Sequence, residues 1–327
     1  MNAPAPRART RAMRRRHGYA ALPPGSLIGI IAPAGPAEPE RVARVAPLFA
    51  AAGYRVRLYP GCARRTGYLA GDDSARLADL HAAFADEEVA AIHCLRGGYG
   101  ALRLLDRIDL ALLRAHPKLL IGYSDITALH ALLARVGLPS LHAPMAASDL
   151  VLDGRAADRA AFFALLGRGL VAGDRLAPAL DAASASAGLR APGVAEGRLV
   201  GGNLSLVTAL LGTRWAWRLR GAILFLEEVG EEPYRVDRCL TQLRLAGALD
   251  AAAGFVLGSF TQAESPAGVL RELLLAHCER AGKPLLGGWP SGHGTPNLAL
   301  PLGLRVRLDA GAGTITLRES LLQRPRG

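Results

Sequence analysis

The chain has 327 residues, half of them hydrophobic, and a formal net charge of +11. This length allows one large or two modest domains, and no apolar run approaches the roughly 20 residues that a transmembrane helix needs. Residues 1–25 contain six arginines and no acid, which predicts a disordered basic arm. Such an arm could contact nucleic acid or anionic lipid. Since nearly all the positive charge of the chain is arginine, we interpret it as compositional bias and expect neither partner.

No two of the cysteines lie close enough in sequence for a Cys-x-x-Cys metal or redox motif. The segment that follows the paired arginines of the arm, residues 17–24, is not the apolar core of an export signal. Without an export signal or a disulfide pattern, we expect a cytoplasmic protein with reduced thiols and no bound metal. The cysteines are Cys62, Cys94, Cys239 and Cys278.

Short apolar strands alternate with helical patterns from Leu27 onward. This alternation predicts a parallel sheet with right-handed crossovers, and hence a Rossmann-like α/β domain over residues 26–148. The expected strands are Leu27–Ile31, Arg55–Tyr59, Val89–Leu95 and Lys118–Gly122. The expected helices are Pro39–Ala52, Ser74–Ala85, Ala101–Ile108 and Ile126–Val136.

Residues 149–190 change character and are interpreted as a connector, with one helix near Arg155–Leu166. Residues 191–322 resume the alternation and are expected to form a second α/β domain. Its expected strands are Gly193–Val200, Ala222–Leu226, Phe255–Phe260, Pro284–Leu286, Leu304–Leu308 and Thr314–Leu317. Its expected helices are one that ends at Leu211, Tyr234–Ala246 and Gly268–Ala281.

Ser124 ends one apolar run and opens the next helical pattern. A serine on a sharp strand-to-helix turn holds its hydroxyl out of the sheet, beside the backbone N–H groups of the helix start. This arrangement is that of a nucleophile elbow, although Ile126 replaces the second glycine of the Gly-x-Ser-x-Gly pattern. The glycine loop Arg96–Gly100 follows another strand, so it should lie at the same sheet edge. The loop matches no nucleotide-binding motif. Its glycines could let backbone N–H groups come close to an oxyanion, or the loop could be a simple tight turn.

A serine hydroxyl needs an adjacent base, and two residues could complete such a system. His293 lies between glycines after the strand Pro284–Leu286, where a tight loop can present it to a cleft. Glu227 closes the strand Ala222–Leu226, and a carboxylate there can fix the tautomer of a histidine. From the residues alone, His293 could equally be a surface loop histidine, and Glu227 could belong to an ordinary acidic loop.

Nine short segments occur in an order that carries a family resemblance, although each is weak alone. They are Ile30–Gly35, Leu95–Ala101, Ile121–Ala128, His142–Met145, Glu196–Leu204, Leu226–Glu228, Tyr234–Arg238, Leu257–Phe260 and Gly292–His293. Jointly they resemble the LD-carboxypeptidase family of serine peptidases, which also includes the microcin C self-immunity proteins. The resemblance runs from about Leu22 to the C-terminus. Departures are small: family members often carry glycine where Ala143 stands and aspartate where Glu228 stands.

The resemblance implies a catalytic triad of Ser124 as nucleophile, His293 as base and Glu227 as the residue that orients the base. It implies that Ser124 lies on the N-terminal domain, and that Glu227 and His293 lie on a β-rich, swivelling C-terminal domain across a cleft. It further implies that the backbone N–H groups of Gly98 and Asp125 form the oxyanion hole. No cofactor is expected.

The resemblance also implies the reaction, which is hydrolysis of an L,D-peptide bond of murein tetrapeptide with release of terminal D-alanine, in peptidoglycan recycling. Because this substrate is anionic, Arg96 and Arg235 are candidate carboxylate ligands, although each could instead form a structural ion pair. Asn203 is expected to cap a helix and could also meet substrate. Since homodimers occur in the family, we expect one here.

Three other interpretations remain open from the sequence. A microcin-immunity-like peptidase would use the same triad on an aminoacyl or peptidyl nucleotide toxin. A non-catalytic protein could capture a peptide in the cleft without turnover. A nucleic-acid binder would depend on the basic arm and would show a steep salt dependence.

Overall fold

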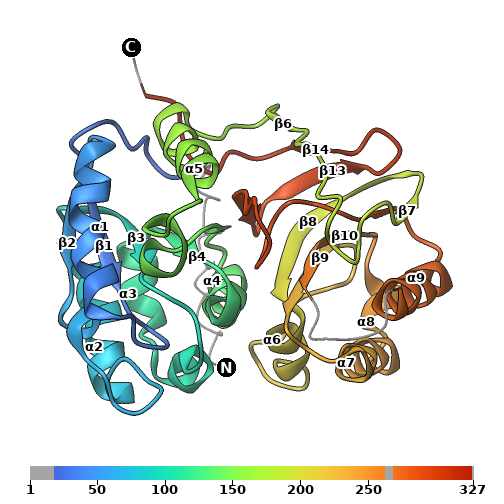
Figure 1. Cartoon of the computed structure of the whole chain (residues 1–327), viewed down its shortest axis with the longest axis horizontal. Coiled ribbons are helices and arrows are strands. Elements are labelled where there is room, and N and C mark those ends of the chain that lie inside the picture. The colour runs from blue at the N-terminus through green and yellow to red at the C-terminus, as the bar shows by residue number, and fades with distance from the viewer. Residues whose placement is uncertain (1–17, 262–267, 326–327) are drawn as a thin grey trace, which may run out of the picture.

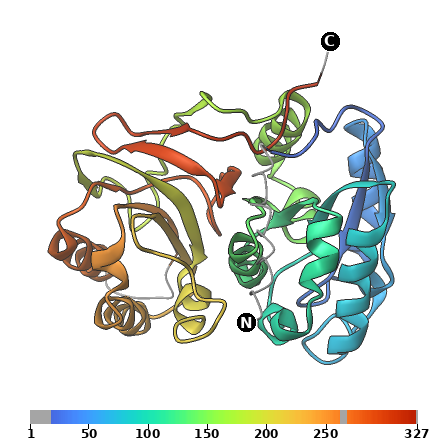
Figure 2. The same cartoon turned by 180° about the vertical axis from the view of Figure 1, so that it is seen from behind.

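The computed structural model describes residues 18–261 and 268–325, which form two α/β units that lie side by side (Figures 1 and 2). Residues 1–17 of the expected basic arm lie outside the described residues. Residues 18–25 do not extend the arm, because the backbone of Tyr19 bridges to Leu322 and Leu22 is buried. Tyr19 and Leu22 therefore pack against the folded chain, although the sequence predicted that they belong to the arm.

The first unit contains a sheet of six strands in the order β12-β5-β4-β3-β1-β2. The first five strands along the chain pair in parallel, as the alternation of strands and helices predicted. The sixth, β12, comes from the far end of the chain and pairs antiparallel with β5. The strands are β1 (Leu27–Ile31), β2 (Arg55–Leu58), β3 (Val89–Cys94), β4 (Leu119–Gly122), β5 (Ser140–His142) and β12 (Leu300–Leu302).

Helices cover both faces of this sheet. Ile28 and Ile30 of β1 pack in the same core as α1, whereas Leu27 and Ile31 pack with α2 and α4 on the opposite face, as the two-residue period of a strand requires. The expected helix Ala101–Ile108 is a 3₁₀ segment, and a 3₁₀ turn over Ser124–Ile126 precedes α4. The helices are α1 (Pro39–Ala51), α2 (Asp73–Ala85), α3 (Leu110–Ala115) and α4 (Thr127–Arg135).

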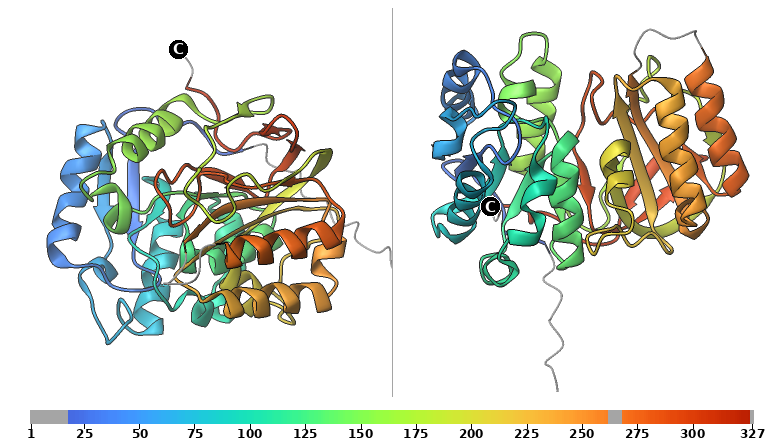
Figure 3. Two further views of the ribbon diagram at one scale, coloured as in Figure 1. Left: turned by 45° about the vertical axis from the view of Figure 1, so that its right-hand side comes forward. Right: turned by 90° about the horizontal axis from the view of Figure 1, so that it is seen from below.

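The second unit is built on eight strands in the order β6-β14-β13-β8-β9-β10-β11-β7. Strands β8 to β11 pair in parallel, and the flanking strands pair antiparallel. Figure 3 shows α7 and α9 on the side of this sheet that faces away from the first unit. The strands are β6 (Arg175–Leu176), β7 (Arg190–Ala191), β8 (Val194–Asn203), β9 (Ile223–Val229), β10 (Gly254–Thr261), β11 (Leu285–Leu286), β13 (Arg305–Asp309) and β14 (Thr314–Leu317). The helices are α6 (Leu204–Ala209), α7 (Pro233–Leu245), α8 (Ala248–Ala251) and α9 (Val269–Ala281).

The segment expected to be a connector does more than join the units. Its helix α5 (Ala156–Arg168) packs on the first unit, where Phe163 makes ring contacts with Phe49 and Tyr54. Its short strands β6 and β7 close the two ends of the second sheet. The units meet where α4 packs against β8 and α6, so the end of β4 and the ends of β8 and β9 lie on facing sides of one boundary. No helix in the described part of the chain is long and apolar enough to cross a membrane.

Candidate active site

Ser124 occupies the turn between β4 and α4 that the sequence predicted. Among the described residues it is the one non-glycine residue with a positive φ, at 63°. This left-handed conformation costs an L-residue about 1–2 kcal/mol, and strain of this kind gathers at functional turns. The turn reverses the chain so sharply that the Ser124 side chain leaves the sheet edge and faces the second unit.

A chain of two hydrogen bonds links Ser124 to the second unit. The Oγ atom of Ser124 lies 3.1 Å from Nε2 of His293, and Nδ1 of His293 lies 2.7 Å from Oε2 of Glu227. Since a carboxylate only accepts, Nδ1 carries the proton, and the neutral imidazole leaves Nε2 to accept from the serine hydroxyl. The three predicted residues therefore lie together. Ser124 comes from the first unit, Glu227 from β9 and His293 from the loop before β12.

The electrostatic surroundings of His293 favour its protonated form. Burial is the largest single influence and opposes the charged imidazolium, but the charge and hydrogen bond of Glu227, together with the charges of Asp149 and Glu228, outweigh it, so the pKa of His293 is raised. Glu227 is fully buried, and its Oε1 has no hydrogen-bond partner among the described residues. Its carboxylate therefore interacts mainly with the imidazole of His293.

Two glycines allow the close approach of these groups. A Cβ atom on Gly97 would lie 2.9 Å from Cβ and 3.1 Å from Oγ of Ser124, and one on Gly292 would lie 2.6 Å from Oε2 of Glu227. The distances of 2.9 Å and 2.6 Å are shorter than a Cβ atom tolerates, and the distance of 3.1 Å is also tight. The glycine loop and the His293 loop thus need glycine at these positions for the serine and the glutamate to fit.

Asp125 ties the glycine loop to the serine turn. Its carboxylate accepts a hydrogen bond of 2.8 Å from the backbone N–H of Ala101, and burial raises the pKa of Asp125 to about 6. The N–H of Gly35 also holds the loop through the carbonyl of Gly97 at 2.9 Å. The backbone of Gly97 and Gly98 is thereby fixed beside Ser124.

Helix α5 braces the loop that carries His293. Arg155 donates to the carbonyl of Gly294 at 3.0 Å and pairs with the buried Asp158 at 2.8 Å. Asp158 in turn accepts from the backbone N–H of Asn297 at 3.1 Å, and Asn297 accepts from that of Gly292 at 3.0 Å. The segment expected to be a mere connector therefore positions the candidate base.

Sequence reasoning missed a second pair of residues beside His293. The ring of Tyr123 lies 4.8 Å from that of His293, and its hydroxyl donates to Oδ1 of Asp149 at 2.9 Å. Asp149 also accepts from the N–H of Met145 and the hydroxyl of Ser148, each at 2.9 Å. Asp149 lies in a π-helical turn after β5, a segment without periodicity, so no spacing in the sequence pointed to it.

The three predicted substrate contacts lie in different settings. Asn203 caps α6 as expected, and its amide donates to the buried Glu228 at 2.7 Å. Arg96 is exposed and donates to the carbonyl of Pro36 at 2.6 Å. Arg235 is exposed on α7, where its charge faces Glu231 at 3.6 Å and the ring of Tyr234. A substrate role for each stays a prediction.

The described residues contain no group of three or more histidine, cysteine, aspartate or glutamate side chains placed as metal ligands would be. The hydrogen-bonded groups at this boundary are a serine, an imidazole and a buried carboxylate in a row. In such a row the histidine can take the serine proton while the carboxylate stabilises the imidazolium that forms.

Comparisons with known proteins identify the family of the chain. Residues 28–143 match the LD-carboxypeptidase N-terminal domain, and residues 196–308 match the LD-carboxypeptidase C-terminal domain. A Bacillus subtilis protein named "Probable murein peptide carboxypeptidase" is 38% identical over 304 residues, which are 91% of this chain and 93% of that protein.

Two solved structures share the fold. A muramoyltetrapeptide carboxypeptidase from Oxalobacter formigenes superposes with a TM-score of 0.78 at 30% identity, over 92% of this chain and 100% of that one. The microcin self-immunity protein MccF, in complex with aspartyl sulfamoyl adenosine, gives a TM-score of 0.82 over 93% of this chain and 99% of that one. Its 24% identity makes the second likeness one of fold. The chain belongs to the LD-carboxypeptidase family and is a serine-type carboxypeptidase.

Proposed function

We propose that this carboxypeptidase hydrolyses the L,D-peptide bond that precedes the terminal D-alanine of murein tetrapeptide, with Ser124 as nucleophile, His293 as general base and Glu227 as its orienting carboxylate. The observation that carries the proposal is the row of hydrogen bonds from Ser124 through His293 to Glu227 across the two units. The names of the murein-peptide relatives support the choice of substrate.

The mechanism follows from the tautomer that Glu227 imposes. Nε2 of His293 accepts the proton of Ser124 as its Oγ attacks the scissile carbonyl, and the imidazolium then gives that proton to the departing amine of D-alanine. A water molecule, activated by the same Nε2, hydrolyses the ester between Ser124 and the peptide. The serine and the imidazole return to their starting states.

We assign the oxyanion hole to the backbone N–H groups of Gly98 and Asp125. Gly98 belongs to the loop that abuts Ser124, and Asp125 is the first residue after it, at the start of the 3₁₀ turn that leads into α4. The loss of one oxyanion donor typically lowers the rate by roughly 10²–10³-fold. Arg96, Asn203 and Arg235 remain proposed contacts for the carboxylates and amides of the peptide, and the homodimer and cytoplasmic location remain predictions.

The test is release of D-alanine from murein tetrapeptide by the wild-type protein, Ser124→Ala and the control Ser26→Ala. Ser26 is a surface serine whose hydroxyl donates to the carbonyl of Pro23. We expect release by the wild type and the control, and loss of release in Ser124→Ala with unchanged circular dichroism. Retained release in Ser124→Ala would refute the nucleophile.

A parallel assay with an aminoacyl sulfamoyl nucleotide separates the two substrate classes. Turnover of the nucleotide conjugate together with no D-alanine release would keep the triad and overturn the murein substrate. Turnover of neither by folded wild-type protein would overturn both assignments.

A further inference from the structure

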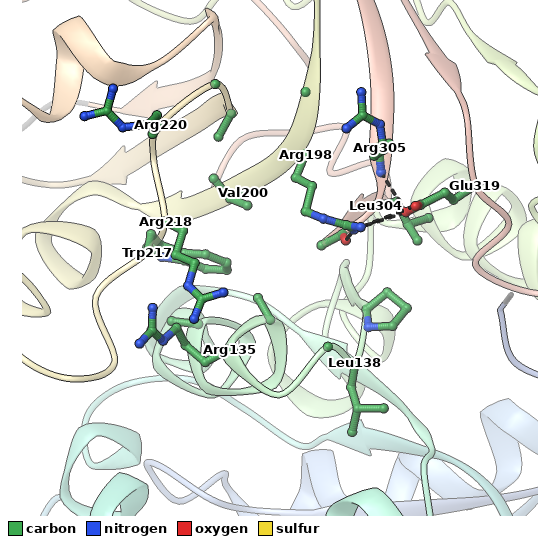
Figure 4. A pocket seen from close by; sticks show the side chains of 18 of the residues that line it. Arg135, Leu138, Arg198, Val200, Trp217, Arg218, Arg220, Leu304, Arg305 and Glu319 are labelled. Atoms are coloured by element: carbon green, nitrogen blue, oxygen red, sulfur yellow. Dashed lines mark hydrogen bonds and ion pairs between the residues drawn. The ribbon is translucent and has the colours of Figure 1, made fainter. Parts of the chain in front are cut away.

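A cavity of about 470 Å³ lies at the boundary of the two units, apart from Ser124, His293 and Glu227 (Figure 4). One wall is the C-terminal end of α4 with Arg135, and the other comprises β8, β13 and the segment before β9. Ser124 and Arg135 lie at opposite ends of one helical stretch, about 16 Å apart at 1.5 Å per residue. The cavity is therefore not a subsite of the proposed active site.

Arginine dominates the lining of this cavity. Among the described residues that line it are five arginines and one acid, Glu319. These arginines are Arg135, Arg198, Arg218, Arg220 and Arg305. Figure 4 shows Arg135 and Arg218 directed from the two walls toward the same corner of the cavity. Such a lining repels cations and attracts an anion.

The ion pairs of the described residues neutralise only part of this charge. Arg198 and Arg305 stand directly opposite each other on β8 and β13, and like charges at opposed strand positions are destabilising. Glu319 contacts both residues. It pairs with the guanidinium of Arg198 at 3.1 Å, and it accepts a hydrogen bond of 3.0 Å from the backbone N–H of Arg305. Within the described part of the chain, the structure gives no ion pair or hydrogen bond to the guanidinium groups of Arg135, Arg218 and Arg220.

We propose that this cavity binds a diphosphate or triphosphate group. Guanidinium groups bind phosphate oxygens bidentately. The lining carries more positive charge than a ligand with a single carboxylate could neutralise. The volume lies within the range of about 300–1,000 Å³ usual for small-molecule sites. Because Arg135 belongs to the first unit and Arg198 and Arg218 to the second, a bound polyanion would bridge the units.

The test is isothermal titration of the full-length protein with inorganic pyrophosphate at low ionic strength. The variant is the double substitution Arg135→Ala with Arg218→Ala, and the control is Arg114→Ala, an exposed arginine on α3 outside the cavity. We expect saturable binding by the wild type and the control, and at least tenfold weaker binding by the double variant. D-alanine release in the absence of pyrophosphate should be equal in all three, which also shows that the double variant is folded.

The outcomes separate the explanations. No saturable binding by the wild type, or equal weakening in Arg114→Ala, would overturn the site. A titration with ATP identifies the source of the phosphate group: equal affinity for ATP and pyrophosphate indicates the phosphates alone, and tighter ATP binding indicates a nucleotide. If the wild type is a dimer in sedimentation, the double variant is a monomer and neither binds pyrophosphate saturably, a second copy of the chain fills the cavity and the proposal is wrong.

Discussion

Ser124 lies in a backbone conformation that its sequence neighbours make possible. Gly122, two residues earlier, leaves room for the side chains of Cys94 and Ile126, and Gly97 leaves room for the side chain of Ser124. The α4 helix then fixes the turn from the other side through the buried core around Ile126 and Leu129. The strain at Ser124 is thus held by packing on both flanks, which is how a hydroxyl is kept in one orientation before a substrate arrives.

Substitution of Gly97 by alanine should impair catalysis without unfolding the protein. The new methyl group would lie within 3.1 Å of Cβ and Oγ of Ser124, so the serine must move, and a displacement of about 1 Å can lower a rate by roughly 10²-fold. Steady-state D-alanine release measures the effect. The control is Gly167→Ala in α5, where a Cβ meets no atom within 4 Å. Equal activity of Gly97→Ala and the wild type would contradict the packing argument.

The raised pKa of His293 sets the acid limb of activity. His293 must be neutral to accept the serine proton, so kcat/KM should fall as the pH drops through a pKa above the ordinary histidine value of about 6.5. Glu227→Gln removes the main charge that raises this pKa, so the acid limb should move to lower pH. Because a neutral amide also fails to hold the tautomer, the maximal rate should fall by roughly 10⁴-fold.

The pH profile of kcat/KM for the wild type and Glu227→Gln checks both statements. The direction of the shift decides the question, because loss of a carboxylate that raised the pKa of His293 can move the acid limb of the profile only toward lower pH. A limb that stays in place, or moves toward higher pH, would show that Glu227 does not govern the ionisation of His293.

At the scale of elements, α5 acts on the site through the loop that carries His293. Arg155→Ala removes the hydrogen bond to the carbonyl of Gly294 and should let the imidazole drift from Ser124. We expect kcat to fall about tenfold while KM changes little, since this loop positions the base and not the peptide. The control is Arg168→Ala, an exposed arginine in the last turn of the same helix. A kcat equal to that of the wild type would show that α5 is only a packing element.

At the scale of the whole molecule, the two units are tied together by exchanged segments. The C-terminal half supplies β12 to the first sheet, and the connector supplies β6 and β7 to the second. The backbone of Tyr19 near the start of the described chain also bridges to Leu322 near its end. The first sheet therefore has its sixth strand only when the C-terminal half of the chain is in place.

We therefore expect one cooperative unfolding transition. Loss of the second unit would withdraw β12 and leave β5 with an unpaired edge, and loss of either unit would expose the shared apolar boundary, so the units should not melt separately. Differential scanning calorimetry, compared with near-ultraviolet circular dichroism, measures this. Two resolved transitions, or a calorimetric enthalpy well above the van't Hoff value, would show that the units are independent.

The fold was largely predictable because its central strands are long enough to show their pattern. Strand β1 and strand β14 have the bounds that the sequence predicted. Strands β6, β7 and β12 were not predicted, because each has only two or three residues and its position is set by partners distant in sequence. For the same reason, Ser124, Glu227 and His293 could be proposed from local signals and a family resemblance, whereas Asp149 and Arg155 act through contacts that no local pattern records.

The proposed nucleophile and base are separated by 169 positions along the chain. A ribosome that adds roughly 5–20 residues per second needs about 10 to 30 s to travel from one to the other. During that interval the emerging polypeptide carries a serine with no base, and products of premature termination before His293 stay inert. The order of synthesis thus delays hydrolytic capacity until almost the entire chain has been translated.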